Sequence, residues 1–99
     1  MPDPRIFPIE FVTDTFATVG VVSTLVLAAN RRRVDAEFVN DGDETVYLAR
    51  GNVAVMGSGI RINARGGCYR IGTNNMFYGD IYAICAGGQL NLTVSEGYL

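Results

Sequence analysis

The chain has 99 residues, 48% of them hydrophobic, and a net charge of −2. This length and composition predict one globular domain with a thin core, and the charge gives no general affinity for nucleic acid or anionic lipid. The sequence contains no histidine, which excludes Ser-His-Asp and Cys-His catalysis within the chain and removes the commonest metal ligand.

The N-terminal segment is apolar and rich in proline. Pro2, Pro4 and Pro8 lack the N–H that a sheet ladder needs and favour extended geometry. We expect residues 1–12 to form an extended arm or edge strand, on its own domain or on a neighbouring subunit, and residues 13–99 to form the folded domain. The arm contributes four predicted partner contacts: Ile6, Phe7, Ile9 and Phe11.

The longest apolar stretch covers residues 16–30. It is shorter than the roughly 20 residues of a membrane helix, and the first residues, MPDPRIF, lack the apolar run of a secretion signal. We therefore expect no membrane span and no membrane partner. Its β-branched residues and Gly20 favour two strands, near 15–20 and 24–29.

Three consecutive arginines, Arg31, Arg32 and Arg33, are the strongest charge feature. They fit a solvated loop, a cluster that grips acidic protein surface, or a nucleic-acid contact. The acidic chain and the absence of interleaved aromatic residues argue against nucleic acid. We predict that these three arginines contact a protein partner.

The next segment, VDAEFV, alternates apolar and charged residues as a half-buried strand does. The stretch that follows, Asn40–Glu44 (NDGDE), could be a metal loop or a turn. A calcium loop of the EF-hand type needs flanking helices and a bidentate Glu at its twelfth position, and neither is present. We predict a hairpin tip with solvated acids.

The second half of the chain continues the same pattern. GIRINAR and LNLTVSEGY alternate, whereas IYAICA and the earlier TLVLAA are apolar on both faces, as in central strands or strands covered by a neighbouring subunit. RGGCYRIG and CAGGQ match no phosphate loop and are predicted hairpin turns or bulges. We expect Cys68 and Cys85 to be buried thiols, with a bridge as the alternative.

These segments predict an all-β protein: a single antiparallel β-sandwich, Greek-key or jelly-roll-like, with about seven to nine short strands. No pair of ionisable residues combines the chemistry and the spacing of a catalytic site, so we expect no enzyme activity and no cofactor.

Several phrases occur in a suggestive order: VSTLVLAANRRR, AEFVNDGDETVYLARGNVAV, GIRINARGGCYRI, MFYGDIYAIC and LNLTVSEGY. Their succession, over residues 21–98, resembles the small all-β virion structural proteins of tailed bacteriophages, which are head-decoration, head-fibre or tail-associated proteins. The family often has Pro-Gly-Gly-Ser where this chain has Arg65-Gly66-Gly67-Cys68, a departure that affects a turn. The resemblance supplies no active-site residues.

The resemblance implies a non-enzymatic virion protein, assembled in the host cytoplasm, most simply a capsid decoration (cement) protein on the outside of the head. Its partners would be the major capsid protein or other virion proteins, with a homotrimer or another small symmetric oligomer as its own assembly. The alternative is a tail or fibre module that binds host-surface glycan. That alternative depends on one cluster of aromatic and amide side chains: Tyr69, Phe77, Tyr78, Asn74 and Asn75.

Overall fold

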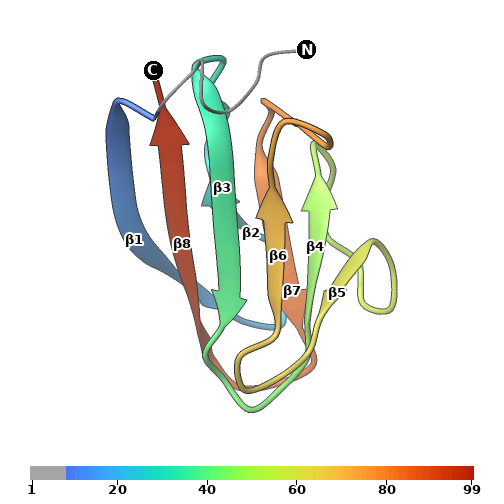
Figure 1. The fold of residues 1–99 in the computed structure, drawn as a ribbon. Coiled ribbons are helices and arrows are strands. Elements are labelled where there is room, and N and C mark those ends of the chain that lie inside the picture. Colours follow the sequence, from blue (N-terminus) through green and yellow to red (C-terminus); the bar gives the residue numbers. More distant parts are fainter. Residues whose placement is uncertain (1–8) are drawn as a thin grey trace.

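A computed structural model describes residues 9–99, which form eight strands and no helix. The strands are β1 (Phe11–Val19), β2 (Thr24–Leu27), β3 (Arg33–Asn40), β4 (Val46–Arg50), β5 (Ile60–Ile62), β6 (Cys68–Ile71), β7 (Ile81–Cys85) and β8 (Leu90–Tyr98). They build two antiparallel sheets that face one another (Figure 1). The expected all-β antiparallel sandwich is confirmed.

The strand order within the sheets defines the topology. One sheet has the order β1-β8-β3-β6 and the other β2-β7-β4-β5. Among these eight strands only β4 and β5 are consecutive in the chain and share a sheet; every other connection crosses from one sheet to the other. This is the jelly-roll arrangement of two Greek keys.

The topology corrects the predicted hairpins. The NDGDE stretch joins β3 to β4, and the two Gly-Gly pairs join β5 to β6 and β7 to β8, so all three connections cross between sheets. The same residue types serve both kinds of connection, because each must reverse the chain within a few residues. The acids Asp41, Asp43 and Glu44 are exposed, as expected.

One buried amide shapes the β3–β4 connection. Asn40 is fully buried, and its Nδ2 donates to the carbonyls of Glu44 (2.7 Å) and Ile62 (3.3 Å). Its Oδ1 accepts from the backbone N–H of Gly42 (2.9 Å). A Cβ at Gly42 would lie 2.6 Å from Cδ2 of Leu90, so this tight turn requires glycine.

The core lies between the sheets and follows the predicted alternation. Ala36 and Phe38 of β3 are buried, as are Leu92 and Val94 of β8, whereas Glu37 is exposed. These side chains belong to one contiguous cluster with residues of both sheets. The period-two pattern therefore assigned the inner face of β8, and that of β3 from Ala36 onward, correctly.

The two segments that are apolar on both faces have different positions. β7 is central in its sheet, as expected, but β2 is an edge strand with Leu25 47% exposed. Of the two alternatives given for TLVLAA, the central strand was therefore wrong, and a strand covered by a neighbouring subunit stays a prediction. β1 begins at Phe11, inside the segment 1–12 that was expected to be an extended arm or an edge strand, and as an edge strand it pairs with β8 along its whole length. The predicted contacts Ile6 and Phe7 lie outside the described residues.

Asn40→Ala should lower the free energy of unfolding by about 1–3 kcal/mol, because it leaves the buried carbonyl of Ile62, the half-buried carbonyl of Glu44 and a backbone N–H without their partner. Urea denaturation monitored by circular dichroism measures the change. The control is Asn91→Ala on the exposed face of β8, which should stay within about 0.5 kcal/mol of the parent. Equal stability of the two variants would contradict the role given to Asn40.

Candidate interaction surfaces

The third arginine of the predicted cluster is part of the interior. Arg33 is 1% exposed, and its Nε donates to Oε2 of Glu96 at 2.7 Å. Its other nitrogens donate to the carbonyls of Phe77 (2.7 Å), Gly79 (3.2 Å) and Ala28 (2.7 Å). The prediction that Arg33 contacts a partner was wrong, because its guanidinium is already committed to these groups.

An irregularity in β3 explains the burial. Arg33 pairs with Tyr98 and Asp35 with Gly97, so β3 carries one extra residue between the two pairs. This bulge turns Arg33 inward, out of phase with the alternation of the rest of β3. Glu96 continues the inward series of β8, two residues after Val94. The sequence alone could have indicated this pair, because a glutamate at an inward-facing position of a strand requires a buried cation as its partner.

Arg33 fixes one end of the sandwich, where a cleft of about 900 Å³ opens. The β2–β3 loop supplies Arg31 and Arg32, β6 supplies Arg70, and the β6–β7 loop supplies Asn74 and Tyr78. Because Arg33 bonds to carbonyls on both sides, at Ala28 and at Phe77 and Gly79, it holds the two loops together. The cleft is therefore preorganised by a buried group beneath it.

The rim of this cleft carries positive charge. Arg31 and Arg32 are exposed, in accordance with a role in contacts. The guanidinium carbon of Arg32 lies 5.9 Å from the ring centroid of Phe11, a cation–π distance. Arg70 lies 3.8 Å from Oδ2 of Asp35, a loose pair at the surface. An acidic group would find several donors here.

Only part of the candidate glycan-binding cluster is exposed for contact with a sugar. Asn75 donates to the Tyr69 hydroxyl (3.2 Å) and accepts from the Gly72 N–H (2.7 Å), so it is occupied in folding its own loop. Phe77 packs against the core. Tyr78 is 49% exposed and faces the cleft. Of the predicted aromatic platform, Tyr78 alone is an exposed side chain.

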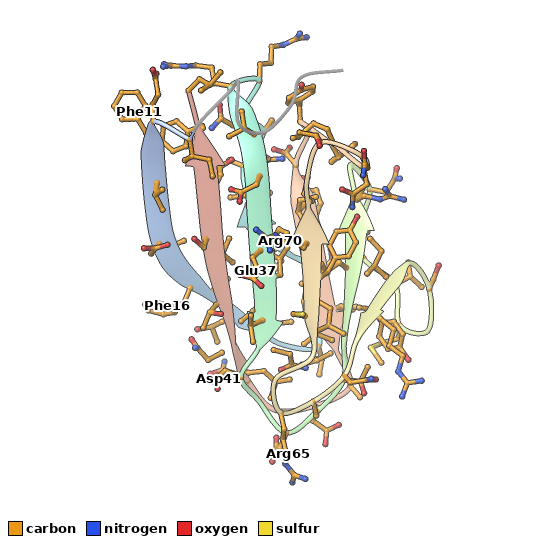
Figure 2. All side chains as sticks on the ribbon, in the orientation of Figure 1. Phe11, Phe16, Glu37, Asp41, Arg65 and Arg70 are labelled. Atoms are coloured by element: carbon orange, nitrogen blue, oxygen red, sulfur yellow. The ribbon has the colours of Figure 1, made fainter. Side chains whose placement is uncertain are left out.

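One apolar surface follows β1. Phe11, Val12 and Phe16 are 51%, 57% and 66% exposed, and Ile9 precedes them. Figure 2 shows Phe11 and Phe16 projecting from this outermost strand. Two of the predicted contacts, Ile9 and Phe11, therefore lie on the surface. Within the part of the chain that the structure describes, β1 is the outermost strand of its sheet, and we call it, with the side that faces away from β8, the β1 edge.

A second apolar surface lies on the loop between β4 and β5. Ala54 and Ile84 are buried but do not belong to the interior core. Ile84 points away from that core, since it alternates with the inward residues of β7, so the loop covers the outer face of this sheet. The N–H of Ala54 donates to Oγ of Ser23 (2.9 Å), which fixes the loop. The loop exposes three apolar side chains, which we call the loop patch: Val53, Val55 and Met56.

The two cysteines differ. Cys85 is buried, and this burial raises the pKa of its thiol above the usual value. Cys68 is exposed, which contradicts the prediction that both are buried; it lies on β6, an edge strand of its sheet. Both are free thiols, so the alternative of a bridge is wrong for this structure.

The described part of the chain has neither a cluster of metal ligands nor an unpaired buried polar side chain. Within residues 9–99, no group of three or more His, Cys, Asp or Glu side chains is arranged to hold a metal ion. Every buried side-chain nitrogen or oxygen in the same range has a hydrogen-bond partner. The described segment also has no helix long and apolar enough to cross a membrane.

Comparison of the chain with known protein families, curated proteins and solved structures found no match.

Arg33→Ala should lower the free energy of unfolding by about 3–5 kcal/mol, because the carboxylate of Glu96 stays buried without its partner. Thermal and urea denaturation measure the loss. Arg31→Ala removes the same side chain from an exposed position and should change stability by less than about 0.5 kcal/mol. If the two variants have the same free energy of unfolding, the buried pair does not hold this end of the sandwich.

Proposed function

We propose that the chain is a non-enzymatic structural protein of a tailed-bacteriophage virion, a capsid decoration (cement) protein that binds the outside of the head. The observation that carries the proposal is the amount of exposed apolar surface on so small a sandwich, with the loop patch foremost. Contiguous exposed apolar side chains mark protein–protein contact sites in soluble proteins. The order of β-strand phrases along the sequence supports the same family.

The mechanism is adhesion. Burying apolar surface contributes about 25 cal/mol per Å² before the costs of association. The loop patch is held in place by the Ala54–Ser23 hydrogen bond, so little ordering cost is added on binding. Arg31 and Arg32 add charge-assisted hydrogen bonds to acidic groups of the major capsid protein, which set orientation and on-rate more than affinity.

Jelly rolls occur in viral capsid proteins and in lectins, so the fold is compatible with either a head or a glycan-binding role. A fold alone does not assign a function, since unrelated activities share each common architecture. The choice of the head over the tail depends on the adhesive surface, because a cement protein needs broad contact and no deep pocket.

The proposal predicts saturable binding of the purified protein to undecorated phage heads, measured by co-sedimentation. Val53→Asp combined with Val55→Asp should weaken binding at least tenfold, because two carboxylates would be buried in the apolar contact. The control, Asn63→Asp with Asn91→Asp, adds the same charge at exposed positions outside the patch and should bind as the parent does. Retention on tails without binding to heads would refute the cement role.

The second candidate function is a tail or fibre module that binds host-surface glycan. Tyr78 favours it, since this exposed ring lies on a cleft whose wall also contains Asn74. Aromatic faces and amides are suited to sugar rings and hydroxyls. A glycan array should then give hits that Tyr78→Ala removes and Phe16→Ala retains. An array without hits would exclude this candidate.

A further inference from the structure

We propose that β1 pairs with β1 of a second copy of this chain, antiparallel and across a two-fold axis at Thr15. The two sheets that contain β1 would then form one continuous eight-stranded sheet. This inference concerns the chain's own assembly and does not depend on the proposed function.

The β1 edge is long, and no strand among the described residues 9–99 pairs with the side that faces away from β8. β1 has nine residues, and its pairing with β8 runs without a register shift from Phe11 opposite Tyr98 to Val19 opposite Leu90. Natural edge strands are usually kept short or blocked by lysine, proline or a bulge. β1 has none of these, and Asp14 is its single charged residue. Such an edge is a template for another strand.

The hydrogen-bond pattern shows which residues of β1 offer free backbone groups. The N–H of Asp41 donates to the carbonyl of Asn91 (3.0 Å), so the odd-numbered residues of β8 direct their backbone groups toward β3. The even-numbered residues of β8 then face β1, where their partners are odd-numbered. The N–H and C=O groups directed to the free edge belong to the even-numbered residues: Val12, Asp14, Phe16 and Thr18.

This pattern restricts the register of two antiparallel β1 strands. Residues whose backbone N–H and C=O groups point to the free edge must pair with one another. The two-fold axis therefore passes through a residue rather than between two residues. An axis at Asp14 would place two carboxylates directly opposite, which is destabilising. An axis at Thr15 pairs all nine residues and sets Asp14 opposite Phe16 of the second copy.

The same register makes the strand complementary to itself. It sets Phe11 opposite Val19 of the second copy, and Val12 opposite Thr18. Val21 and Val22, which follow β1, are 60% and 71% exposed. The same register, continued past β1, sets Val21 opposite Ile9 of the second copy, which is 44% exposed, and symmetry repeats this contact. The exposed apolar residues that flank β1 therefore cover one another, which selects a second copy as the occupant.

An isologous pair of this kind closes at two subunits. A homotrimer, the assembly suggested by the sequence, would need β1 to bind a different surface of its neighbour. The mass of the protein in solution therefore tests whether a dimer forms, and disulfide cross-linking tests the position of the two-fold axis.

Sedimentation equilibrium should give a mass approaching twice the chain's 10.7 kDa as concentration rises. Phe16→Pro should give a folded monomer, since the N–H that it removes faces the free edge and proline is tolerated there. Val53→Ala, which trims an equally exposed side chain away from β1, should remain dimeric. A parent that stays monomeric or forms trimers, or a dimer unaffected by Phe16→Pro, would overturn the inference.

Cross-linking tests the register even if Phe16→Pro fails to fold. In a Cys68→Ser background, Thr15→Cys should form a disulfide-linked dimer under mild oxidation, because the two Cα atoms at the axis are about 4.5 Å apart. Thr13→Cys should not, because its own counterpart would be displaced by four residues, or roughly 13 Å. Equal cross-linking of the two variants, or none by Thr15→Cys, would overturn the proposed pairing.

Discussion

A buried charge is the constraint on which one end of this molecule depends. An arginine in the interior is tolerated only when its charge is paired and its N–H groups have acceptors. Arg33 meets both conditions through Glu96 on β8 and three carbonyls on the β2–β3 and β6–β7 loops. If those loops moved apart, the buried guanidinium would therefore lose its hydrogen-bond acceptors. The positions of Arg31, Arg32 and Tyr78 at the surface follow from this buried pair.

The sequence predicted the local part of this structure and missed its long-range part. Alternation identified the inner face of β8, and that of β3 from Ala36 onward, because side-chain direction along a regular strand depends only on residue parity. It did not separate hairpins from sheet-crossing connections, since NDGDE has the residue types that either requires. Nor did it show that TLVL lies at an edge, because apolar residues on both faces fit a central strand as well as a strand whose outer face remains exposed.

The candidate surfaces likewise include local features that the sequence predicted and long-range features that it missed. Two of the three arginines and two of the apolar arm residues that were predicted to contact a partner are exposed, since a basic loop and a strand edge are local features. Their contact role stays a prediction. Arg33 was misplaced because its burial depends on a bulge in β3 and on an acid 63 residues away. The loop patch was not predicted at all. Its exposure depends on how the β4–β5 loop folds over a sheet, which no local pattern encodes.

The two apolar surfaces have different physical characters, and this allows them to act together. The β1 edge offers backbone hydrogen bonds in a fixed register, which suits a specific symmetric contact. The loop patch offers only side chains on a fixed loop, which suits a broad contact with a larger surface. Pairing through β1 would place two loop patches on one rigid particle. Because the second patch then binds at a high effective concentration, a weak contact for one copy becomes a strong one for the pair. A protein of this size could hold a larger assembly together in this way without a large interface on either copy.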